Sequence, residues 1–240
     1  MSCVYNRARQ VREIAGSAPQ QDGVANAPER IVAPVPPGLV LHAAASYDLL
    51  IWLVTLGRER TFRDKILDLA RLKPGETVLD VGCGTGSLAI RAKRRVGPTG
   101  AVFGIDASPE MLARADRKAR KAGLEIVLNQ APGQALPFPD GQFDAVLSTL
   151  MLHHLPRKAR EQCGQEIARV LKPGGRVLAV DFSAPAQNQK RMLGRIHRHG
   201  HVKLANIVAM LEGVGLNVIE SGPVGYRDLQ FALATAQRGA

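Results

Sequence analysis

The sequence has little of what marks a secreted, disulfide-stabilised or membrane-spanning protein. Its 240 residues include only three cysteines, Cys3, Cys83 and Cys163, which are too few and too widely spaced for a disulfide framework or a Cys-x-x-Cys metal site. No apolar run approaches the roughly 20 residues that a membrane-spanning helix needs. We therefore expect a protein of the reducing cytoplasm.

Aromatic residues and acids are also scarce. Aromatics make up 4 % of the chain, and 32 Lys and Arg outnumber 21 Asp and Glu to give a formal net charge of +11. Such a charge is attracted to nucleic acid, an anionic membrane surface or an acidic substrate. Two basic runs, at 91–95 and 114–121, contain no aromatic residue for base stacking, which disfavours nucleic acid. We expect both runs on outward-facing helices, away from the ligand, while peripheral membrane contact stays open.

The remaining composition fits one globular domain. With 45 % apolar residues, a chain of this length can bury a sizeable core. Residues 1–38 are rich in proline and lack a periodic apolar pattern, which predicts a flexible arm. Residues 39–240 are predicted to form a single domain that begins with a helical lid at about 41–72. The sequence indicates no oligomeric state.

The stretch at 77–86, TVLDVGCGTG, predicts a buried strand, a tight glycine turn and a helix that opens at Ser87. It lacks the Gly-Lys-Ser/Thr of a P-loop, and its glycine spacing differs from G-x-G-x-x-G. Asp80 at the strand end would repel a pyrophosphate but suits a cationic or hydroxyl-bearing ligand. A second strand at 101–106 ends in Asp106, where a doubly wound sheet places its acceptor for ribose hydroxyls. The pattern therefore predicts a nucleoside ligand.

Strand and helix signals alternate from 77 to 182 and are followed by two strands, at 216–220 and 229–235. This order predicts a Rossmann-like, doubly wound α/β fold with a seven-stranded sheet. We expect a mostly parallel sheet with an antiparallel last strand, helices on both faces and the 78–81 strand in its interior. The other strands are expected at 124–129, 143–149 and 176–182. A Ser108-Pro109 cap is predicted to open one helix, and Lys172–Gly175 to close another.

Four stretches resemble, in order, the successive motifs of class I S-adenosylmethionine (SAM) dependent methyltransferases: 80–86 (DVGCGTG), 104–112 (GIDASPEML), 135–144 (ALPFPDGQFD) and 169–175 (RVLKPGG). Among these enzymes the chain is most similar to the ubiquinone/menaquinone-biosynthesis C-methyltransferases. The resemblance implies SAM as the cofactor. It does not identify the methyl acceptor, because these motifs serve the cofactor.

The predicted cofactor contacts come from the glycine turn, the ends of the next strands and the lid: Asp80, Gly82, Gly84, Thr85, Gly86, Asp106, Ala107, Met111, Gly133, Gln134, Thr149 and Tyr47. The resemblance implies that Tyr47 closes over the methionine end of the cofactor, although a core position is the alternative. Pro132 replaces the acidic or amide residue of many relatives. Since proline has no side-chain acceptor, adenine recognition must use the Gly133 backbone and Gln134.

The acceptor side is predicted at the end of the fourth strand. The following sequence lacks the Asn/Asp-Pro-Pro-Tyr/Phe of nucleic-acid amino-methyltransferases and the Pro-Cys of cytosine C5 enzymes. His153 or His154 is a candidate general base, with a structural role as the alternative, because imidazole exchanges protons near neutral pH. A polar insert at 184–201 should wall the acceptor pocket. Its alternating histidines, 197, 199 and 201, lack nearby Cys or carboxylate ligands, so no metal is expected.

Three functions follow from these patterns. The leading one is methyl transfer from SAM to a small, partly apolar molecule, such as a quinone-like or phenolic metabolite. The charge of +11 motivates an RNA methyltransferase as the second. Pro132 motivates the third, a non-catalytic SAM-binding protein with a regulatory or assembly role.

Overall fold

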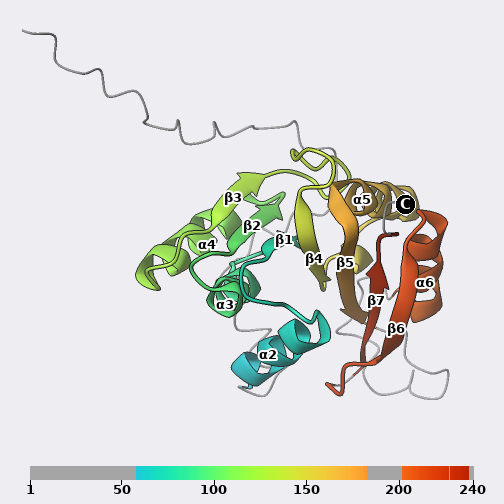
Figure 1. The fold of residues 1–240 in the computed structure, drawn as a ribbon, viewed down its shortest axis with the longest axis horizontal. Coiled ribbons are helices and arrows are strands. Elements are labelled where there is room, and N and C mark those ends of the chain that lie inside the picture. The colour runs from blue at the N-terminus through green and yellow to red at the C-terminus, as the bar shows by residue number, and fades with distance from the viewer. Residues whose placement is uncertain (1–57, 183–201, 227, 238–240) are drawn as a thin grey trace, which may run out of the picture.

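A computed structural model describes residues 58–182, 202–226 and 228–237. Figure 1 shows one sheet with helices packed around it. The strands are β1 (Thr77–Val81), β2 (Ala101–Asp106), β3 (Val127–Gln130), β4 (Phe143–Thr149), β5 (Leu171–Phe182), β6 (Asn217–Pro223) and β7 (Leu229–Thr235). The helices are α2 (Glu59–Leu69), α3 (Ser87–Val96), α4 (Pro109–Lys121), α5 (Arg157–Val170) and α6 (Leu204–Gly213), with a short 3₁₀ helix, η1 (Leu152–His154).

The seven strands lie in the order β3-β2-β1-β4-β5-β7-β6. Strands β1 to β5 pair in parallel, and β7 runs antiparallel to both of its neighbours, β5 and β6. Strand β1 therefore lies inside the sheet, between β2 and β4. The predicted doubly wound, mostly parallel seven-stranded sheet is confirmed.

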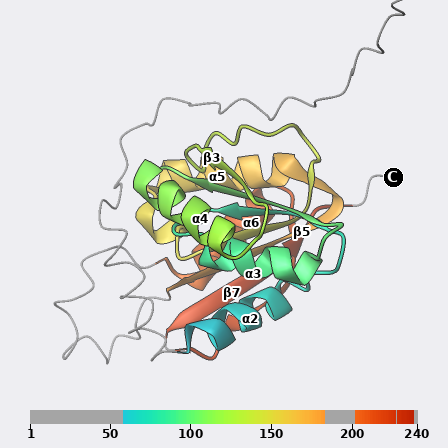
Figure 2. The same cartoon turned by 90° about the vertical axis from the view of Figure 1, so that its left-hand side faces the viewer.

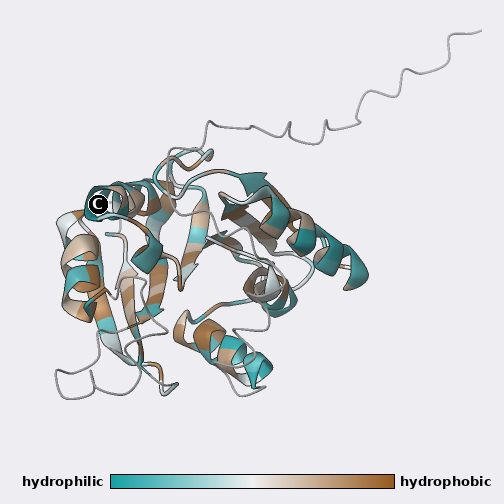
Figure 3. Cartoon of the chain, turned by 180° about the vertical axis from the view of Figure 1, so that it is seen from behind, coloured by the Kyte–Doolittle hydropathy of each residue, from teal (hydrophilic) through white to brown (hydrophobic). Residues whose placement is uncertain are grey.

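Apolar side chains cover both faces of the sheet. Phe62 and Ile66 of α2 join α3 in one buried cluster, whereas Ile167 of α5 and Leu211 of α6 belong to a second cluster on the other face. Figure 2 shows α3 and α5 on opposite sides of the sheet. In Figure 3 the strands carry many hydrophobic stretches, whereas α4 is mostly hydrophilic. The prediction of helices on both faces is confirmed.

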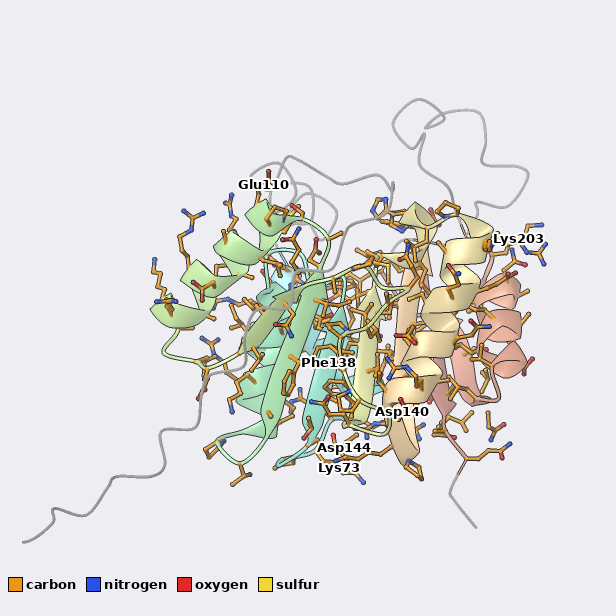
Figure 4. The ribbon with its side chains drawn as sticks, turned by 90° about the horizontal axis from the view of Figure 1, so that it is seen from above. Lys73, Glu110, Phe138, Asp140, Asp144 and Lys203 are labelled. Carbon is orange, nitrogen blue, oxygen red and sulfur yellow. The ribbon has the colours of Figure 1, made fainter. Side chains whose placement is uncertain are left out.

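The two ends of the parallel strands have different roles. Figure 4 places Glu110 at one end of the sheet, and Lys73 and Asp144 at the other. At the amino end the Asp144 carboxylate accepts hydrogen bonds from the Thr77 backbone N–H and the Lys172 ammonium, each at 2.8 Å. These bonds clamp β1, β4 and β5 together. The carboxyl end, where Asp80, Asp106 and Thr149 lie, carries the candidate site.

Local signals mark most boundaries correctly. Ser108 caps α4, since its hydroxyl accepts from the Met111 N–H at 3.3 Å and Pro109 occupies the first helical position. The third strand begins at Val127 instead of 124, because the chain first closes α4 with Gly123 at φ +64°. The fifth strand begins at Leu171, which pairs with Phe143 before a register shift. The predicted stop at Lys172–Gly175 is therefore an irregularity within β5.

Several predictions concern residues outside the described ranges. They are the arm at 1–38, the first part of the lid with Tyr47, and the insert at 184–201 with its three histidines. Helix α2 lies within the range predicted for the lid, and the lid role stays a prediction. Within residues 58–182, 202–226 and 228–237, no helix is long and apolar enough to cross a bilayer. The domain boundary at 39 and the cytoplasmic location stay predictions.

Candidate active site

The turn after β1 contains three glycines, and replacing any of them by another residue would distort the turn. Gly82, Gly84 and Gly86 have φ angles of +74°, +53° and +75°, which side chains rarely tolerate. A Cβ atom on Gly82 would lie 2.5 Å from Cγ of Met151. The Gly82 and Cys83 N–H groups both donate to the Ile105 carbonyl, at 2.9 and 2.8 Å. The loop is thus fixed against β2 and directs the N-terminus of α3 at the carboxyl edge of the sheet.

Asp106 is held beside this loop by its backbone. Its Oδ2 accepts from the Gly84 N–H and its Oδ1 from the Ser108 N–H, both at 2.9 Å. Burial raises the pKa of Asp106, and these backbone hydrogen bonds oppose the rise. A carboxylate has about four lone-pair sites, so each oxygen can accept another hydrogen bond. The geometry fits a pair of ligand hydroxyls.

Asp80 lies deeper, at the end of β1. It is 2 % exposed, and its Oδ2 has no hydrogen-bond partner within the described part of the chain. Burial raises the pKa of Asp80 to about 7, Arg63 lowers it and Asp106 adds to the rise. A buried carboxylate oxygen without a hydrogen-bond partner costs stability, which a cationic ligand group would offset.

A small cavity of about 20 Å³ adjoins Asp80. Its walls come from the glycine loop, the end of β4 and helix α2: Phe62, Arg63, Asp80, Gly82, Cys83, Thr85, Ser87, Leu88, Thr149 and Leu150. Arg63, 8 % exposed and bonded to Glu59 at 2.9 Å, is a wall residue that the sequence analysis missed. A volume of about 20 Å³ has room for about one water molecule, but the carboxylate and the guanidinium in its walls are the partners that an ammonium and a carboxylate group need, such as those at the methionine end of SAM.

The predicted adenine-side residues follow β3, next to Asp106. The Ala131 N–H donates to the Asp106 carbonyl at 3.2 Å, which ties this segment to β2. Gly133 is closely surrounded, since an added Cβ would lie 3.2 Å from the Cys163 sulfur, and Gln134 is half-buried. Met111 is buried, and the Ala107 carbonyl accepts from Gln130 at 3.3 Å. The predicted residues thus converge from separate segments, apart from Tyr47, which lies outside the described ranges.

A histidine–carboxylate pair lies at the same edge. The His153 Nδ1 atom is 2.6 Å from Asp181 Oδ1, and the His153 backbone N–H donates to Asp181 Oδ2 at 3.0 Å. The Phe182 N–H donates to Asp181 Oδ1 at 2.7 Å, and the Asp181 side chain is fully buried. Asp181 was missed in the sequence, although an acid at the end of the fifth strand repeats the pattern of Asp80 and Asp106.

The neighbouring side chains connect this pair to the cofactor loop. The His153 and His154 rings are in tilted contact, with centroids 3.9 Å apart and an interplanar angle of 43°. Met151, two residues before His153, lies against Gly82 and near Gly133. With Nδ1 facing a carboxylate, the neutral His153 ring carries its proton there and presents Nε2 as an acceptor. The arrangement can therefore bind a nucleoside with an amino-acid tail and remove a proton beside it.

Comparison with known proteins gives consistent matches. A family profile described as "Methyltransferase domain" matches residues 78–175. The demethylmenaquinone methyltransferase of Thermus thermophilus is 40 % identical over 154 residues, 64 % of this chain and 69 % of that protein. The ubiquinone/menaquinone biosynthesis C-methyltransferase UbiE of Salmonella arizonae is 38 % identical over 149 residues, 61 % of this chain and 59 % of that protein. A solved SAM-dependent methyltransferase from Aquifex aeolicus superposes with a TM-score of 0.61 at 26 % identity, covering 72 % of this chain and 88 % of that one.

Proposed function

The chain belongs to the SAM-dependent methyltransferases, and on this premise we propose that it methylates a ring carbon of a small, partly apolar hydroxyaromatic or quinol. The observation that carries the proposal is the His153–Asp181 pair, which lies at the same sheet edge as the cofactor loop. The names of the two relatives support the acceptor class, since one is a demethylmenaquinone methyltransferase and the other is a C-methyltransferase of ubiquinone/menaquinone biosynthesis.

The cofactor-binding roles rest on the fit of the residues. We assign Asp106 to the ribose hydroxyls, Asp80 to the ammonium group and Arg63 to the carboxylate of SAM. Gly133 and Gln134 border the adenine side. Bound SAM supplies an electrophilic methyl group on a sulfonium. Alignment of donor and acceptor by such contacts can contribute about 7–11 kcal/mol of barrier reduction, so no elaborate catalytic apparatus is required.

The proton chemistry falls to His153. Methylation at a ring carbon is favoured when the neighbouring hydroxyl is deprotonated, because the negative charge then spreads onto the ring. Nε2 of His153 accepts that proton, and the buried Asp181 carboxylate stabilises the resulting imidazolium while fixing the ring. The His154 ring contacts this ring at a tilt, and His154 is the alternative base.

The acceptor surroundings match a partly apolar molecule. Leu150 is buried beside the cofactor cavity, and Met151 and Leu155 pack against the core on either side of the histidines. Among the described residues, the phenylalanine beside His153 is Phe182, and their T-shaped contact is not the exposed stacking face that a nucleic-acid base needs. The small-molecule acceptor is therefore favoured over RNA.

A methyl-transfer assay tests the proposal. The full chain is incubated with SAM labelled in its methyl group and, in separate reactions, with 1,4-naphthohydroquinone, simple phenols and bulk RNA. Label is expected in the naphthohydroquinone or phenol fraction. Label in RNA alone contradicts the acceptor class. SAM binding without transfer to any acceptor would favour a non-catalytic SAM-binding protein.

A further inference from the structure

Helices α2, α3 and α4 form a basic groove on the outside of the molecule, with a volume of about 420 Å³. Six cations from the three helices line it, and they are Arg60, Arg63, Arg91, Arg94, Lys118 and Lys121. Glu59 is the acid in the lining, and Ser87, Ile90 and Ala122 complete it. Residues distant in sequence thus bring one sign of charge to one concave surface.

The local acids do not balance this charge. Glu59 bonds to Arg63 at 2.9 Å, and Asp64, which lies outside the groove, pairs with Arg91. Arg60, Arg94 and Lys121 are exposed and make no ion pair within the described ranges. Like charges at such short range repel one another and lower the stability of the free protein. A bound anion would remove that repulsion.

The lining indicates which anion fits. Four of the six cations are arginines, whose planar forks match phosphate oxygens. The described lining of the groove has no aromatic side chain on which a base could stack, and α4 is mostly hydrophilic in Figure 3. We propose that this basic groove binds a phosphate-bearing anion, either a free phosphate compound or a phospholipid headgroup. The two basic runs lie on α3 and α4, and Lys118 of α4 reaches the glycine loop at Ser87.

The groove touches the cofactor site there. Lys118 Nζ donates to Thr85 Oγ1 at 2.8 Å and to Ser87 Oγ at 3.0 Å, so α4 reaches the glycine loop. Arg63 and Ser87 line both the groove and the cavity beside Asp80. A phosphate in the groove would attract Lys118 and Arg63, and thereby weaken their hold on the cofactor end. We expect SAM and the anion to oppose each other's binding, and this coupling rests on the proposed cofactor role of Arg63.

Calorimetric titration of the full chain with inorganic pyrophosphate tests the site. Binding is expected to weaken by about tenfold or more in the double variant R94E/K121E. The matched control is R120E/R157E, which makes the same charge change outside the groove, since Arg120 pairs with Asp116 and Arg157 with Glu161. Thermal melts confirm that both variants fold. Equal pyrophosphate affinity in both variants, or none in the wild type, overturns the proposal.

Further arms separate the sources of the phosphate. A lipid headgroup is supported if the protein sediments with phosphatidylglycerol vesicles but not with phosphatidylcholine vesicles. This sedimentation should be lost in R94E/K121E and blocked by pyrophosphate. Pyrophosphate binding without sedimentation supports a free phosphate compound. Binding of RNA that depends on Arg94 and Lys121, with no response to pyrophosphate or lipid, overturns the proposal in favour of a nucleic-acid surface. Because these readouts need no methyl acceptor, failure of the proposed function leaves them interpretable.

Discussion

Asp181 holds His153 at two points, with one carboxylate oxygen 2.6 Å from Nδ1 and the other accepting the backbone N–H at 3.0 Å. The strand end and the 3₁₀ helix are thereby joined through a side chain that is fully buried. A histidine fixed in this way has one tautomer and one orientation, which are the requirements of a general base.

Replacing Asp181 by Asn should preserve the shape of the site while removing the charge that stabilises the His153 imidazolium. We expect the single-turnover rate of methyl transfer to fall by about a hundredfold or more in D181N and H153A, with unchanged SAM affinity. H154A is the comparison, and a larger loss there would move the base to His154. Full rates in all three variants would make these histidines structural.

Asp106→Ala should weaken SAM binding by more than about tenfold, or 1.4 kcal/mol. The substitution removes the proposed acceptor for the ribose hydroxyls and leaves the Gly84 and Ser108 N–H groups without this partner. Calorimetry with SAM measures the change. Gly84→Val should have a larger effect, because its side chain enters the cofactor space at φ +53°. An unchanged dissociation constant in D106A would refute the ribose role.

Asp80 should make folding stability depend on pH. Its pKa is raised from 3.8 to about 7, so the folded state retains a proton that the unfolded chain has lost between these values. The free energy of unfolding therefore falls as pH rises through this window. Relative to wild type, Asp80→Asn should gain stability between pH ~4 and ~7, by an amount of order 1–4 kcal/mol, and show no further gain above pH ~7. Urea unfolding at several pH values measures the free energy of unfolding of both proteins. A difference between variant and wild type that does not change with pH would contradict the prediction.

The same carboxylate predicts the pH dependence of cofactor binding. An ammonium group pairs with the ionised form of Asp80, so wild-type affinity for SAM should increase as pH rises to about 7. In Asp80→Asn the affinity should be weaker and flat over this range. Parallel titrations of the two proteins, with S-adenosylhomocysteine as a second ligand, provide the measurement. If the affinity for SAM changes with pH equally in wild type and variant, Asp80 has a purely structural role.

Gly86 is a packing constraint as well as a conformational one. At φ +75° an added Cβ would lie 2.8 Å from the Ala115 Cβ of α4, whereas Gly123, at φ +64°, has open space. Gly123→Ala should cost roughly 1–2 kcal/mol through backbone strain alone. Gly86→Ala should cost about 1–3 kcal/mol more, because α4 must shift. Chemical unfolding measures the loss of stability in each variant. Equal losses in Gly86→Ala and Gly123→Ala would show that α4 shifts without a cost in free energy.

The cofactor half of the site was predictable because its signals are local. The Thr77–Gly86 stretch contains a strand, its turn and its helix start, and parallel pairing necessarily brings Asp106 beside it. The two missed residues depend on distant contacts. Asp181 meets His153 across 28 residues, and Arg63 reaches the Asp80 cavity from a helix that precedes β1. No periodicity or spacing encodes such pairs, because they depend on strand order and helix packing.

The basic groove illustrates the same limit. The runs at 91–95 and 114–121 were evident as charge, and their positions on two outer helices were predicted. The concave surface exists only because α2 packs beside α3 and adds Arg60 and Arg63. The long side chain of Lys118 then reaches the glycine loop from α4. The pattern of residues in the sequence does not reveal this contact.

The position of the transferred methyl group tests the central claim most directly. Wild-type protein is incubated with 1,4-naphthohydroquinone and SAM carrying a ¹³C-labelled methyl group, and the product is analysed by carbon NMR. We predict a signal of a methyl group bonded to a ring carbon, and its loss in H153A at saturating SAM. A methoxy signal, or an equal ring-methyl signal from H153A, would contradict base-assisted carbon methylation at this site.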